Sequence, residues 1–339
     1  MPAEKLSEYL AGISNDLRPN ETPGMDCALV ATRHPGLFSI STTDFFYPNV
    51  ESPFAQGRLA AANVLSDLYA NGVVEVDTVL MILGVSMDME PDHRDIVTTE
   101  MIRGFTAAVR EAGASVTGGQ TVRNPWPIIG GVATSVVREE DLVRPGGARA
   151  GDVLVLTKPI GTQVAANLWQ WRGMVTPNGE RNWPKVAPII TEAQAAVVFD
   201  TAVDSMTRLN RNAAAAMHRH GARGATDITG FGLLGHARNF ASHCTDRVSF
   251  VIDALPIIAR CAEVDDITGG GFRLREGLSA ETSGGLLVAL PSAEAAAAFI
   301  ADVEAADGRP AWVVGHVVET PADGSNGAVI TPHSRIIEV

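Results

Sequence analysis

The chain has 339 residues, of which 46% are hydrophobic and 19% charged, and its formal net charge is −13. This composition supplies a large core and excludes a disordered protein, and the acidic balance argues against a general nucleic-acid binder, which needs basic residues to replace phosphate counterions. No run of 18 apolar residues occurs and the N-terminus is charged and amphipathic, so neither a membrane span nor a secretory signal is predicted.

The first half of the chain alternates strand and helix patterns. A helix is predicted over residues 3–15, where apolar residues recur at helical spacing, and turn chemistry follows it. The next predicted elements are strands at 28–31 and 37–41, a helix at 54–70, a strand at 78–85, a helix opened by Pro91, and strands at 115–117 and 128–137. This β-β-α-β-α-β-β order predicts an α+β domain whose sheet carries helices on one face.

Glycine and proline cluster at residues 144–151, which predicts a domain boundary there. We place an N-terminal α+β domain over residues 1–148 and a C-terminal α/β domain over residues 149–339. The second domain is predicted to contain strands at 152–157, 248–252, 284–290 and 311–317 and helices at 192–218, 230–243 and 292–305.

Four aspartates form the sharpest chemical feature, and most of them lie at the ends of predicted elements. They are Asp26, Asp44, Asp67 and Asp227. Few basic residues surround them, so they are poor salt-bridge partners but suitable ligands for Mg²⁺, which takes carboxylate and phosphate oxygens. Local roles stay open, since Asp44 could cap a turn and Asp227 a helix. Asn63 and Asp67 are harder to explain locally, because residues four apart share one face of an otherwise apolar helix.

Glycine clusters form the second feature. Gly118-Gly119 ends a strand, Gly284-Gly285 precedes another, and residues 227–236 run from a strand end into a helix. Glycines let backbone N–H groups approach a ligand closely, and a helix N-terminus favours anions. The Walker and dinucleotide-binding patterns are absent from the sequence. Each glycine pair alone is typical of a turn or a packing contact, but together with acidic strand ends they indicate a bound metal–phosphate group.

A few other side chains are candidates for supporting roles. Arg58 and Lys158 are the basic residues best placed to contact a phosphate or to neutralise an aspartate. Cys27 makes a poor nucleophile, because the neighbouring carboxylate of Asp26 raises the pKa of its thiol. His236 could orient the adjacent loop or cap its helix. The chain has three cysteines, an odd number without close spacing, which fits a reduced cytoplasmic protein.

Six motifs, met in order along the chain, resemble those of the selenophosphate synthetases, also called selenide, water dikinases. They are Thr42–Phe46, Arg58–Ala70, Thr117–Gln120, Leu156–Pro159, Thr226–His236 and Thr282–Leu287. Asn124–Trp126 and the closing Arg335–Val339 are similar to the eukaryotic branch of that family. The resemblance extends from about residue 3 to the C-terminus.

The resemblance implies a two-domain fold like that of aminoimidazole ribonucleotide synthetase. Residues 1–148 would bind ATP and metal and would form a β-barrel across a homodimer. The implied reaction makes selenophosphate from ATP, selenide and water, releases AMP and phosphate, and serves selenocysteine synthesis. Mg²⁺ is the implied cofactor and K⁺ a further candidate. The expected partners are a second copy of the chain and proteins of selenocysteine synthesis, with no nucleic acid and no membrane.

The resemblance also implies roles for individual residues. The metal ligands would be Asp26, Asp44, Asp67 and Asp227. The nucleotide contacts would be Thr43, Asp44, Asn63, Asp67, Gly118, Gly119, Gln120 and Thr121. A triphosphate held by several Mg²⁺ ions needs many carboxylates, because positioning and charge neutralisation dominate phosphoryl transfer. Selenide is already a strong nucleophile, so no strong general base is required for the first transfer.

One part of the family pattern is missing from this sequence. The family carries a glycine-rich N-terminal segment with a cysteine or selenocysteine followed closely by a lysine. This sequence begins at the predicted opening helix, and Lys5 belongs to that helix. We therefore name no catalytic residue. The open explanations are a trimmed chain, which we favour, a proteolysis product, and a natural homologue without selenide chemistry. We expect the fold and most of the metal–nucleotide site, with little or no selenophosphate made.

Two alternatives to this function stay open. One is another ATP-using enzyme of the same superfamily, such as an aminoimidazole ribonucleotide synthetase or a thiamine-phosphate kinase, which shares the acidic metal site. The other is a non-catalytic partner in selenocysteine synthesis that uses the nucleotide structurally. Turnover of ATP with each substrate would separate the enzymes, and stabilisation by ATP without AMP formation would favour the partner protein.

Overall fold

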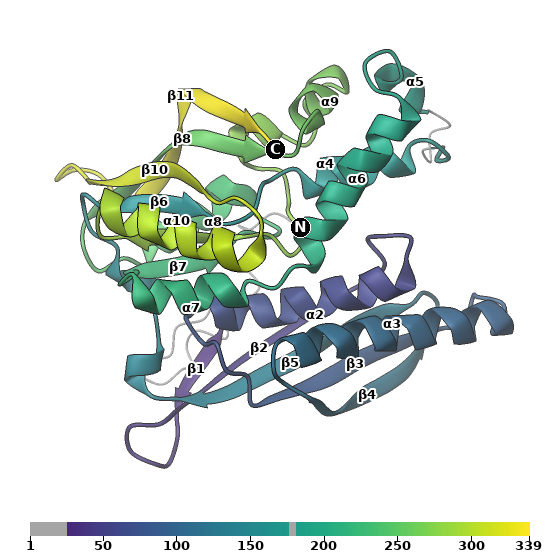
Figure 1. The fold of residues 1–339 in the computed structure, drawn as a ribbon, viewed down its shortest axis with the longest axis horizontal. Helices are drawn as coiled ribbons and strands as arrows, with labels where there is room; N and C mark the ends of the chain where they lie inside the picture. Colours follow the sequence, from purple (N-terminus) through teal and green to yellow (C-terminus); the bar gives the residue numbers. More distant parts are fainter. Residues whose placement is uncertain (1–25, 176–180) are drawn as a thin grey trace.

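The computed structural model describes residues 26–175 and 181–339 and arranges them around two β-sheets, each with its own helices (Figure 1). The predicted helix over residues 3–15, with Lys5, lies outside the described residues. No helix in the described part of the chain is long and apolar enough to cross a membrane.

The first half forms a five-stranded sheet in the order β1-β2-β5-β3-β4. Its strands are β1 (Ala28–Ala31), β2 (Phe38–Phe46), β3 (Thr78–Ser86), β4 (Val116–Asn124) and β5 (Ile128–Val137). Only the β3–β4 pair is parallel, since a helix crosses over between those two strands. Helices α2 (Pro53–Ala70) and α3 (Pro91–Glu111) lie on one face of the sheet, which confirms the predicted α+β arrangement (Figure 1).

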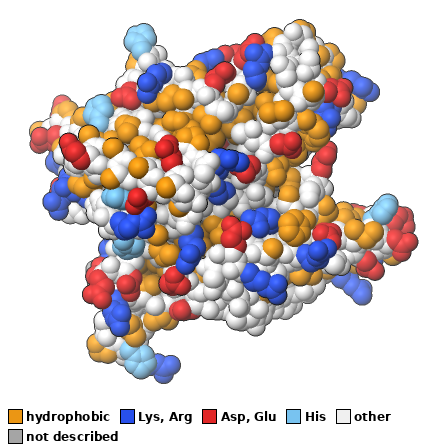
Figure 2. All heavy atoms as spheres, viewed as in Figure 1, with side chains coloured by type: hydrophobic (Ala, Val, Ile, Leu, Met, Phe, Trp, Pro, Cys, Tyr) orange, Lys and Arg blue, Asp and Glu red, His pale blue; other side chains and the backbone are white. Residues whose placement is uncertain are grey.

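Helix α2 begins and ends where its sequence provides caps. The Ser52 side chain accepts a hydrogen bond from the N–H of Ala55, Pro53 occupies the first turn, and Asn71 closes the C-terminus. The helix is buried along most of its length because α3 packs on one side and the second half of the chain on another. Helix α3 projects further, and acidic side chains gather at its protruding N-terminal end (Figure 2).

Two glycines allow α2 and α3 to touch backbone to backbone. A Cβ atom added to Gly57 would lie 2.0 Å from the carbonyl oxygen of Met101, and one added to Gly104 would lie 1.9 Å from that of Phe54. Any larger residue at either position would separate the helices. This contact fixes α2, and with it the polar residues that α2 carries towards the second half of the chain.

The second half forms a six-stranded sheet in the order β11-β8-β10-β6-β9-β7, in which only β11 and β8 are parallel to each other. The strands are β6 (Val153–Leu156), β7 (Gly224–Asp227), β8 (Val248–Ile257), β9 (Leu286–Leu290), β10 (Trp312–Glu319) and β11 (Gly327–Glu338). The helices are α4 (Thr162–Gln170), α5 (Trp183–Val186), α6 (Glu192–Thr207), α7 (Arg211–Arg219), α8 (Gly232–Ser242), α9 (Cys261–Ile267) and α10 (Ala293–Asp307). Three short 3₁₀ turns complete the described elements: η2 (Glu139–Asp141), η3 (Pro145–Gly147) and η4 (Leu274–Glu276).

The structure differs from the sequence predictions in several elements, and helices α4, α5 and α9 were not predicted. The helix predicted over 192–218 is two helices, because the backbone becomes extended at Arg208 and α7 starts only after Asn210. Strand β4 continues from residue 116 to residue 124, so Gly118-Gly119 lies within a strand and not at its end. Strand β11, over residues 327–338, was not predicted.

The face of the first sheet opposite α2 and α3 carries no described helix, and we call it the outer face. Strand pairing places Thr43, Val132, Leu80 and Gly118 in one row across this face, from β2 to β4. Several large apolar side chains of the sheet are exposed, namely Phe45, Leu80, Val122 and Val136. The outer face is therefore an apolar surface bordered by the exposed edge strand β4.

Candidate active site

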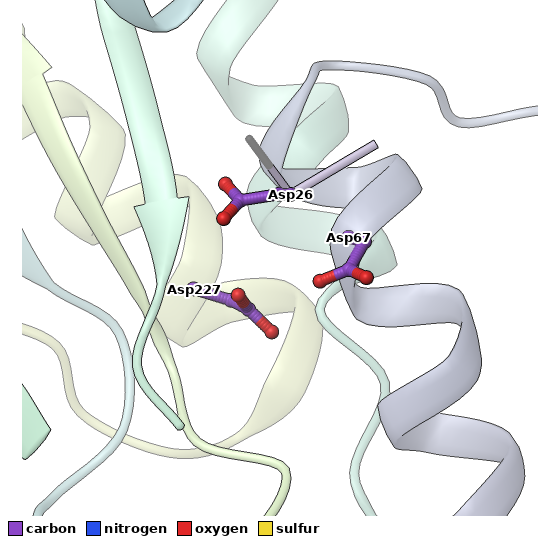
Figure 3. Close-up of side chains that lie close together, drawn as sticks. All are labelled: Asp26, Asp67 and Asp227. Carbon is purple, nitrogen blue, oxygen red and sulfur yellow. The ribbon is translucent and has the colours of Figure 1, made fainter. Parts of the chain in front are cut away.

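Three of the four predicted metal-binding aspartates meet between the two halves of the chain. Asp67 projects from α2, Asp227 ends β7, and Asp26 precedes β1. One carboxylate oxygen from each lies within 4.8 Å of one from each of the others. Figure 3 shows the three side chains approaching a common space from separate segments. We call Asp26, Asp67 and Asp227 the carboxylate cluster.

Hydroxyl groups hold two of these carboxylates in place. Thr42 on β2 donates its hydroxyl hydrogen to Asp67 Oδ2, and Thr226 on β7 donates to Asp26 Oδ1 over 3.2 Å. Asp227 is 2% exposed, and its Oδ2 atom is buried without a hydrogen-bond partner among the described residues. A buried carboxylate oxygen without a protein partner is costly, which indicates that a cation belongs beside it.

The electrostatics of the cluster support the same conclusion. Burial, followed by repulsion from Asp227, raises the pKa of Asp26 and of Asp67 well above the usual value. Burial raises the pKa of Asp227 as well, and the hydroxyl of Ser66 and the charge of Lys158 partly oppose that shift. A divalent cation would remove this repulsion, and a set of oxygen ligands alone suits a hard ion such as Mg²⁺. The residues present therefore fit magnesium.

Asp44 lies at the edge of a cavity of about 650 Å³ next to the cluster. Asp67 also lines this cavity, and α4 supplies an opposite wall that includes Gln163 and Asn167. Burial, with repulsion from Asp227, raises the pKa of Asp44 to about 7. The structure thus brings Asp44 near the cluster, on the side where a bound molecule has room.

The remaining predicted nucleotide contacts lie in two different places. Asn63 lines the cavity, and its Oδ1 accepts a hydrogen bond from the N–H of Ser283 over 3.2 Å. Thr43, Gly118 and Gln120 lie on the outer face, while Gly119 and Thr121 point to the opposite side of β4. Strand β4 is three strands away from β2, a separation of about 14 Å. Within one chain, the β4 residues do not join the cluster.

Neither basic residue singled out in the sequence reaches the cavity. Arg58 forms an ion pair with Glu111 at 2.7 Å. Lys158 is 1% exposed, and its Nζ donates to the carbonyl oxygens of Arg208, at 2.6 Å, and Ser283, at 3.0 Å. Burial, and then the charge of Arg208, lowers the pKa of Lys158 well below its usual range. Lys158 therefore ties two segments together from inside and does not contact a phosphate in the cavity.

Sequence reasoning missed the α4 side of the cavity. Glu281 also lines this cavity and is 5% exposed, and its carboxylate accepts hydrogen bonds from the N–H groups of Gly161, at 2.7 Å, and Thr162, at 2.9 Å. Burial raises the pKa of Glu281 to about 7. The spacing of Gln163 and Asn167, four residues apart, was the available signal for this helix face.

Burial also shifts the pKa of two further side chains singled out in the sequence, Cys27 and His236. Burial, and then the carboxylates of Asp67 and Asp26, raise the pKa of the Cys27 thiol well above its usual range, which agrees with the prediction of a poor nucleophile. His236 Nε2 accepts a hydrogen bond from the N–H of Phe231 over 3.3 Å. Burial lowers the pKa of His236 to about 4, so the ring is neutral and orders the loop after Asp227.

Comparison with protein families matches both halves of the chain. Residues 24–137 match the N-terminal domain of AIR synthase related proteins, and residues 149–326 match the C-terminal domain of the same group. The chain is 48% identical over 344 residues to a selenide, water dikinase of Trypanosoma brucei brucei, covering 100% of this chain and 86% of the relative. It is 50% identical over 319 residues to the human selenide, water dikinase 2, covering 93% of this chain and 69% of the relative.

Solved structures share the fold at lower identity. A thiamine monophosphate kinase from Aquifex aeolicus aligns with a TM-score of 0.65 at 17% identity, covering 100% of both chains. The hydrogenase maturation protein HypE in complex with ATP aligns with a TM-score of 0.65 at 16% identity, covering 98% of this chain and 92% of that one. At these identities the likeness concerns the fold alone, and it agrees with the predicted two-domain architecture.

Proposed function

The chain belongs to the selenide, water dikinase family, and we propose that its carboxylate cluster holds metal and the phosphates of ATP during selenophosphate synthesis. The activity is the ATP-dependent formation of selenophosphate from selenide and water. One observation carries the assignment of the site. Side chains from positions 26, 67 and 227 converge to within 4.8 Å, and the buried Oδ2 of Asp227 lacks a partner among the described residues.

Mg²⁺, when bound, would neutralise phosphate charge and align the transferred group, which is the main requirement of phosphoryl transfer. Asp26, Asp67 and Asp227 would hold it, with Asp44 at the cavity edge. Thr42 and Thr226 orient the carboxylates of Asp67 and Asp26 before any ligand arrives, because each hydroxyl donates to one of their oxygens. The carboxylates are thus already oriented in the folded protein, so the reaction does not require them to reorganise.

The composition of the cavity bears on how the phosphate acceptor would be held. In the described part of the chain, no lysine, arginine or histidine lines the cavity, and its walls are mainly carboxylates, carboxamides, hydroxyls and apolar groups. Selenide is itself a strong nucleophile, so the first transfer requires its orientation towards the phosphate more than a strong general base. The carboxamides of Gln163 and Asn167 face this space from α4.

We also propose that two copies of the chain pair through their outer faces. Association of these faces would bury the exposed apolar residues Phe45, Leu80 and Val122. Pairing would place the partner subunit's β4 beside the end of β2, so the predicted contacts Gly118 and Gln120 would complete the nucleotide site of the other copy. This accounts for residues that a single chain keeps about 14 Å from β2.

The domain boundary and the cellular setting are proposals of the same kind. We place the boundary between residues 148 and 149, just after the short turn η3, where the first sheet has ended and β6 has not begun. A cytoplasmic location is supported by the three cysteines, which are all buried and free. Selenocysteine synthesis would then be the consumer of the product.

Phosphorus NMR tests the reaction and the site together. The protein is incubated with ATP, Mg²⁺ and selenide. Because the sequence lacks the family's cysteine- or selenocysteine-lysine segment, we expect selenophosphate, AMP and orthophosphate at a low level, and only when all three are present. The variant Asp227→Asn should form none, while Asp253→Asn, an exposed aspartate of β8, should match the unaltered protein. Selenophosphate formation by Asp227→Asn would remove the cluster from the mechanism. Phosphorylation of thiamine phosphate would favour the kinase alternative.

A further inference from the structure

Two carboxamide side chains of α4, Gln163 and Asn167, line the cavity beside the carboxylate cluster. Both are half-buried and lie four residues apart, so they share one face of the helix. Each uses one end of its carboxamide in a hydrogen bond within the protein, while the other end has no partner among the described residues. We call Gln163 and Asn167 the carboxamide pair.

The partners of the carboxamide pair fix which end of each side chain is left free. The backbone N–H of Ala280 can only donate, and it donates to Gln163 Oε1 over 3.2 Å. The carbonyl oxygen of Gln163 can only accept, and it accepts from Asn167 Nδ2 over 2.9 Å. The atoms left over are Gln163 Nε2, which donates, and Asn167 Oδ1, which accepts, and neither of them is buried. The carboxamide pair therefore offers the cavity one donor beside one acceptor.

Further hydrogen bonds hold this wall of the cavity against the loop that follows Asp227. The carboxylate of Glu281 accepts from the N–H groups of Gly161 and Thr162, where α4 begins. The N–H of Glu281 in turn donates to the carbonyl oxygen of Thr229 over 3.0 Å, two residues after Asp227. The carboxamide pair and the carboxylate cluster thus belong to one connected framework, so the pair is in place before any ligand enters.

A donor beside an acceptor suits a water molecule better than an anion. Water accepts one hydrogen bond while it donates another, whereas the Oδ1 of Asn167 would repel a selenide ion or a phosphate oxygen. Cβ atoms four residues apart on a helix lie about 5–6 Å from each other, a gap that one water molecule bridges. A glutamine carboxamide orients the attacking water in other phosphoryl-transfer enzymes.

We infer that Gln163 and Asn167 orient the water molecule that hydrolyses ADP in the second step of the reaction. This inference rests on the proposed function, in which transfer of the first phosphoryl group to selenide leaves ADP. The water oxygen forms a bond to the β-phosphorus, and the bond from that phosphorus to the oxygen bridging to the α-phosphate breaks. AMP leaves with this oxygen and the electron pair, and one proton of the water passes to a phosphate oxygen, so that orthophosphate is the second product.

The test follows the two phosphoryl transfers separately by phosphorus NMR, with as much protein as ATP so that slow turnover is visible. In Gln163→Met and in Asn167→Leu we expect AMP formation to slow about 100-fold and ADP to accumulate, while selenophosphate formation changes by less than about twofold. A merely structural role would slow both steps together. Equal losses of selenophosphate and AMP, or no accumulation of ADP, would overturn the inference.

Matched variants and labelled water sharpen this test. Gln170→Met makes the same change seven residues later on α4, at an exposed carboxamide without a partner among the described residues, and should leave both steps unchanged. Separation of the two steps by Gln170→Met would count against a fixed pair. If Gln163→Met does not fold because the bond to Ala280 is lost, Asn167→Leu decides, since that side chain bonds only within α4. Heavy oxygen from labelled water should enter orthophosphate, and label in AMP would place the attack at the α-phosphorus and overturn the inference.

A crystal structure of the protein with ADP and Mg²⁺ gives a readout that needs no turnover. We expect an ordered water molecule within hydrogen-bond distance of both Gln163 Nε2 and Asn167 Oδ1. A phosphate oxygen at either atom, or no water between them, would overturn the inference. Binding of ADP away from the carboxylate cluster, or an unaltered protein that makes neither ADP nor AMP from ATP, would instead overturn the proposed function on which the inference rests.

Discussion

The carboxylate cluster and strand β4 are two polar regions of the molecule, and their surroundings are opposite. The cluster lies between the two halves, where Thr42 and Thr226 fix the carboxylates of Asp67 and Asp26. Strand β4 is exposed along nearly its whole length at the edge of its sheet. The difference teaches that the cluster is assembled within one chain, whereas β4 would join a site only through the proposed pairing of two copies.

The largest expected effect comes from removing one charge of the cluster. Asp67→Asn should reduce selenophosphate formation more than about 100-fold, since a direct ligand contributes more than the groups that orient it. The same change should raise the melting temperature of the metal-free protein, because burial, and then repulsion from the neighbouring aspartates, raises the pKa of Asp67. Thermal unfolding with and without Mg²⁺ measures this, with exposed Asp253→Asn as the control. A lower melting temperature without metal would show that the cluster is not strained.

The buried carboxylate of Glu281 predicts a pH dependence of stability. Its pKa is about 7 in the folded protein against an ordinary value of 4.5, so the folded state binds the proton more tightly. The stabilising contribution is full below about pH 4.5 and is lost as the pH rises through 7, by up to about 3 kcal/mol.

Glu281→Gln should flatten that part of the stability profile, as denaturant unfolding between pH 4 and pH 8 would measure. The exposed Glu304→Gln serves as the matched change. An unchanged slope in Glu281→Gln would mean that the three hydrogen bonds to Glu281 keep it ionised after all.

Two neighbouring glycines of β4 test whether an exposed strand can still require glycine at a particular position. Gly119 has φ +147°, and an added Cβ would lie 1.9 Å from the carbonyl oxygen of Met81, whereas the nearest atom for Gly118 is 3.4 Å away. Gly119→Ala should therefore cost about 1–3 kcal/mol of unfolding free energy, and Gly118→Ala much less. Equal losses in urea unfolding would contradict this difference between the two positions.

The smallest expected effect concerns the predicted nucleotide contact on the outer face. Gln120→Ala removes one exposed hydrogen-bonding group, so the KM for ATP should rise about threefold while kcat and Mn²⁺ affinity stay unchanged. Steady-state kinetics at saturating selenide measures the KM for ATP and kcat separately. A fall in kcat with an unchanged KM would place Gln120 in the chemistry, and no effect at all would remove β4 from the nucleotide site.

Much of this molecule could be predicted because its signals are local. Helix α2 is marked by its apolar pattern and the Asn71-Gly72 end, and Asp26, Asp67 and Asp227 stand out as carboxylates among apolar and small neighbours. Their convergence agrees with the prediction of a shared site.

The features that were missed depend on contacts between distant segments. The helical pattern continues through residues 208–210, so no local sequence signal predicts the break between α6 and α7. Lys158, 50 residues earlier in the chain, stabilises this break by donating to the carbonyl oxygen of Arg208. The pair Gly118-Gly119 is typical of a turn, yet pairing with β3 keeps it in a strand. Glu281 caps a helix 119 residues earlier in the chain, and such a contact leaves no pattern in the sequence.

The separation of the cluster residues along the chain has a consequence for protein synthesis. Asp67 and Asp227 are 160 positions apart, since 227 minus 67 is 160. At the usual pace of translation, roughly 10 to 30 s pass between the emergence of the two residues from the ribosome. During that time the polar face of α2 has no partner from β7. A nascent chain therefore lacks the assembled site, and ATP turnover begins only after both halves have been made and joined.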